Sequence, residues 1–263
     1  PDTMTRAVGG ERAAIERLLS VMQRPFYNLA LRMIGDRALA EDATQECLLR
    51  VMTHLSQYRS EAKLSTWATR IAVNVIFDFK SGMARDIRYT FASFAEKLGE
   101  GRDETAQERP EDALLLKEAK TKCSRALLQC LDGDARVTFV LGEILEFEAD
   151  EAAAILGIRA DAYRKRLSRA RTELTAFLAR ECGVHTAGNG CACHKRLAHA
   201  IKIGRLDPKQ LEVRIADLKD MRVRLALLDS EPRTDALYRA DETPDLRQTV
   251  LDSVRAALFE VSA

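Results

Sequence analysis

The feature that most constrains this chain is a pair of short helical patterns separated by a glycine, in residues 155–171. The first pattern is apolar and breaks at Gly157, and the second carries six basic residues against one acid, Asp161. This arrangement is typical of a helix-turn-helix, in which one helix lies in the major groove of DNA and cations contact the phosphates. The alternative is a solvated basic helix without a ligand. We therefore predict a DNA-binding motif here.

The charge balance limits where such a surface can lie. The chain has 263 residues, enough for two or three small domains, and its net charge is only +1. A nucleic-acid surface must therefore be local and be offset by acidic surfaces elsewhere. The longest apolar runs are too short to span a membrane, and no basic-then-apolar leader opens the sequence. These features favour a cytoplasmic protein without membrane insertion.

Helical periodicity covers nearly the whole chain and predicts an all-α fold. After Gly35, with Asp36 as the expected N-cap, apolar residues recur every fourth position: Leu39, Ala43, Cys47, Val51 and Leu55. A second helix is expected over residues 63–80, with inward positions at Leu64, Trp67, Ile71, Val75 and Phe79. Helices resume near residue 111 and continue to about residue 179.

Two stretches interrupt this pattern. Residues 96–112 hold seven acids against three bases, together with Gly and Pro, and predict a flexible acidic linker. After residue 179 comes a break that contains Cys and His, followed by an amphipathic helix expected over residues 207–229 and a last short helix over residues 246–259. The chain is thus predicted to consist of two helical domains joined by a linker, plus a helical C-terminal extension.

The helix after Asp36 has a polar face opposite its apolar stripe. A wheel at 100° per residue places there Asp42, Gln45, Glu46, Leu49 and Thr53. An ordinary solvated face would explain the acids, but an apolar Leu49 among carboxylates is the mixture found at protein interfaces. The functional interpretation is an acidic docking surface for a basic partner.

The segment around Trp67 combines aromatic, basic and amide side chains. Trp67 alone is more often a core residue than one that contacts a ligand. Asn74 has poor helix propensity and lies among apolar residues, which indicates that its amide bonds to a partner, and Asn can contact base edges. Single-stranded DNA needs cations for its backbone and pockets for unstacked bases. Candidates for these roles are Tyr58, Arg59, Lys63, Lys80 and Arg85.

These motifs, in this order, resemble the extracytoplasmic-function sigma factors, the promoter-recognition subunits of bacterial RNA polymerase. The resemblance covers roughly residues 12–178. It rests on FYNLALRMIGDRALAEDATQE and LSTWATRIAVNVIFDF in the first domain, and on the pattern of residues 131–171 in the second. It implies a region 2 domain (residues 8–85), a flexible acidic linker (86–112), a region 4 helix-turn-helix (113–180) and an extension (181–263).

The resemblance also implies a role for each surface, and none of these roles is catalytic. Asp42, Gln45, Glu46 and Leu49 would dock on the polymerase clamp helices, and region 4 would contact the flap. The residues expected to contact the minus-ten element are Tyr58, Arg59, Lys63, Asn74, Asp78, Lys80 and Arg85. Those expected at the minus-thirty-five element are Arg164, Lys165, Arg166, Ser168, Arg169 and Arg171. Promoter DNA and core RNA polymerase are the implied partners, and an anti-sigma factor is a further candidate.

Two positions in the helix-turn-helix depart from the family pattern. The recognition helix usually opens with Ser or Thr, whereas this chain has Arg159, so that Asp161 is expected to serve the helix N-terminus. Tyr163 stands where the family usually has a Val packed between the two helices. The helix angle and the bases contacted are therefore not assigned from the family.

The extension contains a group of thiols and imidazoles that a minimal sigma factor does not need. The candidate ligands are Cys182, His185, Cys191, Cys193 and His194. Thiolate and imidazole together suit zinc or copper, although a C-x-C pair is tighter than the usual C-x-x-C. Alternatives are a polar turn with incidental Cys and a reversible thiol switch. The remaining cysteines, Cys47, Cys123 and Cys130, are expected to be buried hydrophobes.

Three functions compete at this level. The first is a sigma factor regulated by metal or redox state through its extension. The second is a polymerase-independent, metal-sensing helix-turn-helix regulator, which would leave the acidic face and the Trp67 helix without a role. The third is a metal-dependent enzyme, for which the sequence offers neither a nearby acid placed like a general base nor a Gly-rich phosphate loop. We expect a sigma factor that is not an enzyme.

Overall fold

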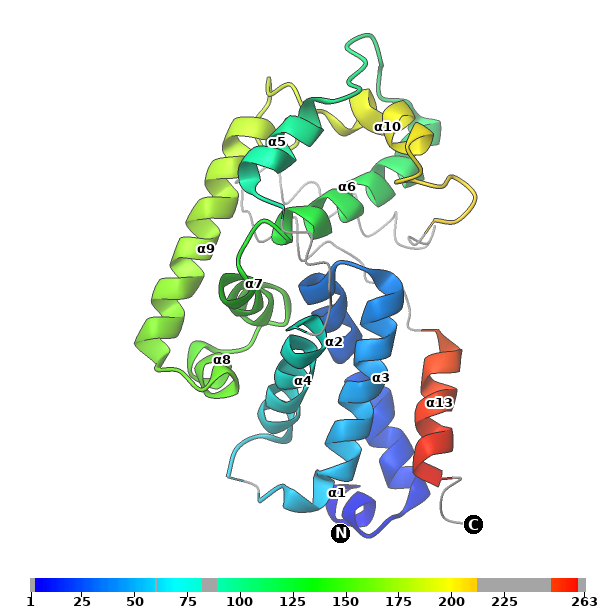
Figure 1. Ribbon diagram of the computed structural model, residues 1–263, viewed down its shortest axis with the longest axis vertical. Coiled ribbons are helices and arrows are strands. Elements are labelled where there is room, and N and C mark those ends of the chain that lie inside the picture. Colours follow the sequence, from blue (N-terminus) through cyan, green and yellow to red (C-terminus); the bar gives the residue numbers. More distant parts are fainter. Residues whose placement is uncertain (1–2, 60, 82–88, 212–246, 260–263) are drawn as a thin grey trace. The chain divides into compact units, whose positions relative to one another are not determined.

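The protein is helical throughout the part described by the computed structural model, residues 3–59, 61–81, 89–211 and 247–259 (Figure 1). Within these ranges the regular structure consists of helices and one isolated backbone bridge between Cys182 and Cys191. The prediction of an all-α fold is confirmed.

Two compact units divide the chain. The first contains Pro1–Ile87, Val140–Lys165 and Asp245–Ala263, and the second contains Arg88–Phe139 and Arg166–Pro244. The helix-turn-helix contributes to both units, and so does the C-terminal extension. The units therefore do not follow the order of the expected domains along the sequence.

Three long helices form the centre of the first unit: α2 (Arg12–Ile34), α3 (Arg37–Thr53) and α4 (Leu64–Ser81). α3 packs against both of the others, and α2 also contacts α4. The apolar side chains between them stabilise the unit by leaving water, and those almost fully buried include Leu29, Ala30, Ala40, Ala43, Cys47, Leu48, Val51, Ala72 and Ile76. The short helix α1 (Thr3–Val8) packs against α2, and the 3-10 helix η1 (Leu55–Gln57) follows α3.

The turn between α2 and α3 has the signals that the sequence predicts. Gly35 ends α2 at φ +82°, in the left-handed region that favours a residue without a Cβ atom. Asp36 caps α3 by accepting a hydrogen bond of 3.0 Å from the backbone N–H of Leu39. Leu39 itself is half-buried. The rest of the expected apolar stripe of α3 is buried: Ala43, Cys47, Val51 and Leu55.

The buried face of α4 is wider than the single stripe that the sequence predicts. Val75 is buried as expected, but the other expected positions are only half-buried: Leu64, Trp67, Ile71 and Phe79. Further buried positions are Ala68, Ala72, Val73 and Ile76. α4 contacts α8 (Ala149–Leu156) as well as α2 and α3, and a helix with several neighbours does not bury one stripe.

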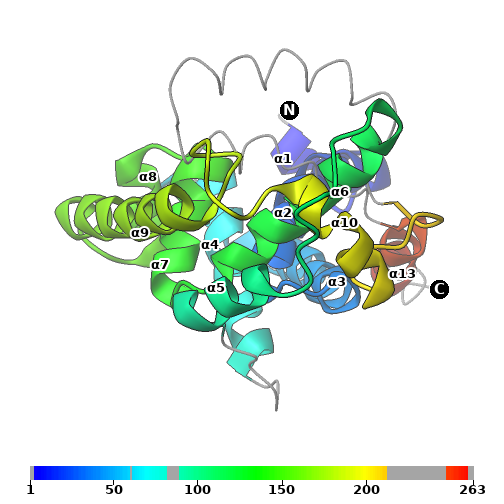
Figure 2. The same ribbon diagram turned by 90° about the horizontal axis from the view of Figure 1, so that it is seen from above.

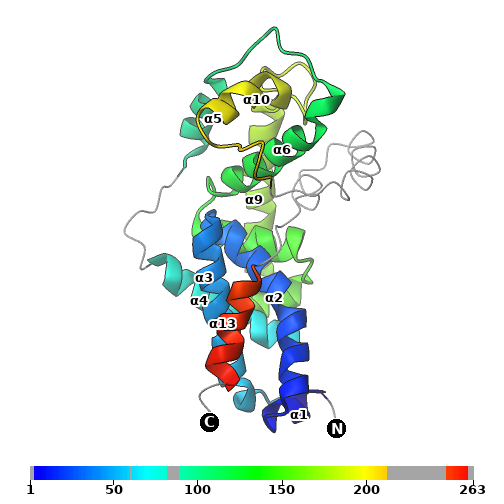
Figure 3. The ribbon, with the colours of Figure 1, turned by 90° about the vertical axis from the view of Figure 1, so that its right-hand side faces the viewer.

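The C-terminal helix α13 (Gln248–Phe259) belongs to the first unit and packs against α3 (Figure 3). It matches the last short helix expected over residues 246–259. Val250, Leu251 and Val254 form its buried side. At its polar edge Arg255 donates to Glu16 of α2 at 3.0 Å. The last helix described is thus a structural part of the domain formed by the first helices.

The helix-turn-helix has the form expected from the sequence. α8 ends at Gly157, which has φ +65° and donates its N–H to carbonyls of the last turn. α9 (Ala160–Glu181) follows as one continuous helix. Ala152, Ala153 and Ile155 of α8 are buried. The chain forms a short π-helix, η3 (Val140–Ile144), before α8.

The second unit contains a helix where the sequence predicts a flexible linker. α5 (Phe91–Gly99) begins with a capping box formed by Thr90 and Ser93. Phe94 and Leu98 of α5 are buried, and the Phe94 ring lies 5.8 Å from the ring of Phe177 in α9. The capping box and these long-range contacts explain why the first part of the expected linker is helical.

The remaining helices of the second unit connect the extension to the second domain. α6 (Ala113–Leu128) follows the 3-10 helix η2 (Pro110–Asp112) and precedes α7 (Gly133–Phe139). α10 (Cys193–Lys202) packs against α6 around a core of Leu116, Leu197 and Leu206 (Figure 2). The beginning of the extension is therefore attached to the first helix after the acidic segment.

Some predictions fall on residues outside the described ranges. Arg85 is one of them, and so is the greater part of the helix expected over residues 207–229. Residues 207–211 are described and form a turn with irregular backbone.

Candidate functional site

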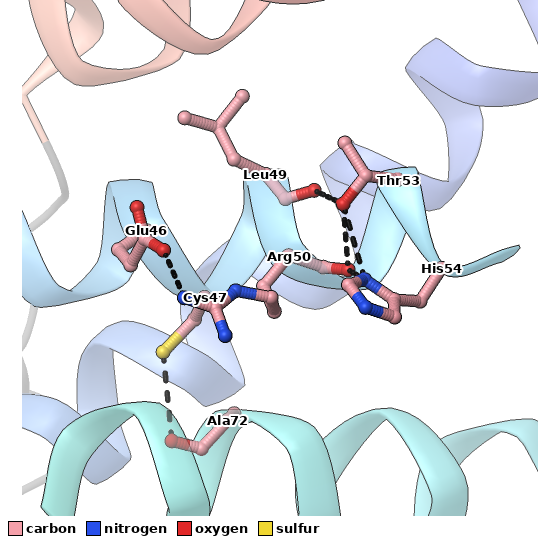
Figure 4. Close-up of polar contacts among 7 residues, drawn as sticks. All are labelled: Glu46, Cys47, Leu49, Arg50, Thr53, His54 and Ala72. Carbon is pink, nitrogen blue, oxygen red and sulfur yellow. Dashed lines mark hydrogen bonds and ion pairs between the residues drawn. The ribbon is translucent and has the colours of Figure 1, made fainter. Parts of the chain in front are cut away.

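The predicted docking face of α3 lies opposite its buried stripe, as the helical wheel requires. Asp42 is exposed, whereas Gln45, Glu46 and Leu49 are half-buried. On the other side of the helix, Cys47 Sγ donates to the carbonyl of Ala72 in α4 at 3.6 Å. Figure 4 shows Leu49 and Cys47 pointing in opposite directions from α3. The structure thus brings the four predicted polymerase-binding residues together on one face.

Basic and hydroxyl side chains modify the end of this face. Arg50 donates to Glu46 at 2.8 Å, one helical turn away (Figure 4). Thr53 donates to the carbonyl of Leu49 at 3.0 Å, and His54 Nδ1 lies 2.8 Å from the carbonyl of Arg50. Because the Glu46–Arg50 pair is exposed, it stabilises the helix weakly, and a basic partner can replace Arg50 at little cost.

A third acid of α3, Glu41, has a role that the sequence analysis does not assign. Its side chain is 1% exposed and forms an ion pair with Arg37 at 3.2 Å. Arg247, immediately before α13, also pairs with this carboxylate. A buried carboxylate requires such partners because its charge is costly to remove from water. The i, i+4 spacing of Arg37 and Glu41 could have indicated their ion pair from the sequence. Nothing in the local sequence indicates that Arg247 joins them.

The loop before α4 brings its aromatic residues together. The rings of Tyr58 and Trp67 lie 5.4 Å apart with a 52° tilt, and the Tyr58 hydroxyl donates to the carbonyl of Ala62 at 2.7 Å. Both aromatic residues are half-buried, and Arg59 is exposed. An aromatic pair at the surface, beside a cation, is suited to stacking of an unpaired base.

Lys63 has an acidic partner in the helix-turn-helix. Its ammonium pairs with Glu151 of α8, and this hydrogen bond raises the pKa of Lys63 above its ordinary value. Lys63 therefore remains protonated at neutral pH. A DNA phosphate at this position would have to replace the carboxylate of Glu151.

Asn74 and Asp78 lie on the exposed side of α4. The sequence predicts apolar surroundings for Asn74, but its neighbours Val73 and Val75 point to the buried side. The amide is thus directed to solvent, where it is accessible to a ligand. Lys80 lies within α4 as predicted.

The basic residues of α9 share an exposed face. Tyr163, Leu167, Ala170 and Leu174 form its buried side. The predicted DNA-binding residues are exposed, except that Arg166 is half-buried: Arg164, Lys165, Ser168, Arg169 and Arg171. A helix with one buried apolar face and one exposed basic face is the geometry that a recognition helix needs.

Two arginines of this basic face form ion pairs with acids of neighbouring helices. Arg164 donates to Asp150 of α8 at 2.9 Å, and Arg166 lies 3.2 Å from Asp134. Asp161, expected at the N-terminus of the recognition helix, lies in the first turn of α9 and accepts from Arg159 at 3.0 Å. The substituted position Tyr163 is fully buried, so the larger ring is accommodated in the core.

The two histidines of the predicted metal site have other partners in the structure. His185 Nδ1 lies 3.1 Å from the hydroxyl of Thr186, and His194 lies 3.9 Å from a carboxylate oxygen of Glu108. In the described ranges, no three His, Cys, Asp or Glu side chains are already arranged to hold a metal ion. Cys191 and Cys193 instead line a cavity together with Cys123 of α6.

The other cysteines outside the extension behave as small apolar residues. Burial raises the pKa of the Cys47 thiol well above its ordinary value, and burial raises that of Cys130 to about 11. Both thiols are therefore protonated and unreactive at neutral pH. Cys123 differs from them because it faces other cysteines, which sequence spacing could not indicate.

A separate property of the fold concerns membranes. In the described part of the chain, each helix is too short or too polar to cross a lipid bilayer.

Comparison with known proteins supports the interpretation of the first unit. Residues 18–85 match the family described as Sigma-70 region 2. The ECF RNA polymerase sigma factor SigE of Mycolicibacterium smegmatis is 30% identical over 155 residues, which cover 59% of this chain and 57% of SigE. The ECF RNA polymerase sigma factor SigW of Bacillus subtilis is 29% identical over 171 residues, which cover 63% of this chain and 89% of SigW.

Among solved structures, that of CnrH in complex with the cytosolic domain of CnrY is similar over 67% of this chain and 94% of CnrH, with 22% identity and a TM-score of 0.48. The sequence matches, together with the exposed acidic face of α3 and the basic face of α9, agree with one family. The chain is therefore similar to extracytoplasmic-function sigma factors, and its residues 18–85 match sigma-70 region 2.

Proposed function

We propose that this protein is a sigma factor that binds core RNA polymerase and directs it to promoters, without catalysing a reaction itself. The observation that carries the proposal is the region 2 match, because it contains α3 and its exposed face. Asp42 and Glu46 offer negative charge to a basic partner, and Leu49 adds apolar contact area. The polymerase clamp helices are the proposed partner of this face.

The DNA contacts are divided between two helical surfaces. The Tyr58–Trp67 aromatic pair with Arg59 would hold a base of the opened minus-ten element, and the exposed Asn74 would contact the same strand. The exposed cations of α9 would bind the duplex at the minus-thirty-five element. These assignments are supported by exposure and by clustering on the correct faces.

The extension is proposed to regulate these activities in response to a metal ion or to redox state. Two of its parts contact the rest of the protein: α13 packs on α3, and α10 packs on α6. A change in the Cys-containing segment before α10 could thus alter the surroundings of the second domain. An anti-sigma protein remains a predicted additional partner.

The first test is binding to core polymerase. Asp42→Lys, alone and combined with Glu46→Lys, places positive charge on the α3 face and should abolish co-elution with core polymerase in gel filtration. The matched control is Glu173→Lys, which reverses an exposed acid of α9 and should leave co-elution unchanged. Tight sequence-specific binding of the wild type to duplex DNA without polymerase, combined with no co-elution, would instead establish the polymerase-independent regulator.

A further inference from the structure

Four cysteines from three segments of the second unit lie close together. Cys123 is in α6, Cys182 directly follows α9, and Cys191 and Cys193 lie at the start of α10. Cys123, Cys191 and Cys193 line one cavity of about 170 Å³. Cys182 forms a backbone bridge with Cys191, and the N–H of Gly183 donates to the carbonyl of Cys191 at 2.9 Å.

The electrostatics of these thiols indicate mutual proximity. Burial raises the pKa of Cys123, and negative charge on Cys193, Cys191 and Cys182 raises it further. Burial also raises the pKa of Cys193 to about 12. Several thiolates could coexist in these buried positions only with a cation among them.

Basic residues around the cavity compensate for such negative charge. Arg196 and Lys122 line the same cavity, and Lys97 lies beside them. Burial raises the pKa of Cys123, Cys191 and Cys193, and the nearby positive charges only partly oppose this rise: Arg196 acts on Cys123 and Cys191, and Lys120 acts on Cys193. A site of four thiolates and one divalent ion carries a net charge of about −2, which these cations would offset.

We propose that Cys123, Cys182, Cys191 and Cys193 together bind one thiophilic divalent ion of the zinc class. Four thiolates are a standard closed set of ligands for structural zinc. In the described structure the thiols do not surround one point, but a Cys side chain can redirect its sulfur by one rotation about the Cα–Cβ bond. On binding, each thiol releases its proton to solvent and forms a sulfur–metal bond.

This ligand set differs from the one predicted from sequence, because it replaces both histidines by Cys123. The difference has a structural consequence. A ligand in α6 ties the segment of residues 182–193 to the second domain, whereas a site within the extension alone would not. The regulatory effect of the ion rests on the proposed function, but its binding does not.

The experiment uses the full chain, reduced and stripped of metal with a chelator, and then titrated with Zn²⁺ or Co²⁺. The expected result is one ion per chain, a tetrahedral Co²⁺ spectrum with intense sulfur-to-metal charge transfer, and protection of four thiols from a thiol reagent. Cys123→Ser and Cys191→Ser should each weaken zinc binding by more than the roughly 10–100-fold that loss of an outer-shell partner causes. Cys123→Ala provides a second variant in case the serine disturbs folding, which circular dichroism checks.

The matched controls are Cys130→Ser, which removes a half-buried thiol outside the cluster, and the two histidine variants His185→Ala and His194→Ala. All three should bind zinc as the wild type does. The four-cysteine site would be overturned if a folded Cys123 variant bound zinc with full affinity. It would also be overturned if His194→Ala lost its affinity for zinc. A reduced chain that binds no zinc and forms only a Cys182–Cys191 disulfide when treated with peroxide would overturn it as well. The zinc titration contains neither polymerase nor promoter DNA. Its outcome is therefore independent of the co-elution test, and either experiment can fail while the other succeeds.

Discussion

The arginines of α9, the proposed recognition helix, differ in their partners, and this difference would determine what each contributes to the proposed DNA binding. Arg164 and Arg166 have acidic partners, Asp150 and Asp134, which phosphates would have to displace. Arg169 lies on the exposed face between them and the end of the helix. The sequence correctly predicts the exposed basic face from its spacing. It could not predict the acidic partners, because Asp134 lies in a different helix.

Arg169→Ala should reduce formation of the promoter complex by the holoenzyme and make its salt dependence less steep. Loss of one phosphate contact flattens the plot of log K against log salt concentration by about one unit. The control is Arg180→Ala at the other end of α9, where Arg180 pairs with Glu181 at 2.8 Å. Equal slopes for wild type and Arg169→Ala would exclude a phosphate contact at this position.

At the scale of elements, local signals predict helices well where they have caps and long periodic patterns. The α2–α3 turn and the α8–α9 turn both have a left-handed glycine at the position read from sequence, Gly35 and Gly157. α5 was not predicted, because it is short and its Thr90–Ser93 capping box lacks the usual Glu or Gln. Its stability comes instead from burial of Phe94 near Phe177, which is distant in sequence.

Gly157→Ala should destabilise the helix-turn-helix. At φ +65° the added Cβ would meet only Arg70, at 3.9 Å, so that the cost is conformational and amounts to about 1 kcal/mol. Thermal unfolding measures this change. Gly99→Ala, within α5, provides a comparison of the same chemistry in a helical conformation and should be neutral or stabilising. A lower melting temperature for Gly99→Ala than for Gly157→Ala would contradict this explanation.

At the scale of the whole molecule, the extension is shared between the two units. α13 supplies Val250, Leu251 and Val254 to the first unit, while α10 supplies Leu197 to the second. The sequence predicts both helices but not their packing partners. Contacts such as Arg247–Glu41 join residues far apart in the chain, and the helical periodicity of a sequence does not predict such contacts. The same limit explains why Cys123 was interpreted as an ordinary core residue.

Val254→Asp should detach α13 from α3 and leave the second unit intact. Val254 is fully buried, and a carboxylate there would lack a partner for its charge. Hydrogen exchange should become faster in α3 near Glu41 and remain unchanged in α6 and α10. Ser253→Asp places the same side chain on the exposed side of α13 and should have no such effect. Equal exchange in both variants would show that α13 contributes little to the first unit.

The distance in sequence between Glu41 and Arg247, 206 residues, has a consequence for synthesis in the cell. A ribosome adds about 5–20 residues per second, so that α13 emerges roughly 10–40 s after α3. During that interval Glu41 lacks the ion pair with Arg247. A chaperone could reach this side of α3 before translation ends.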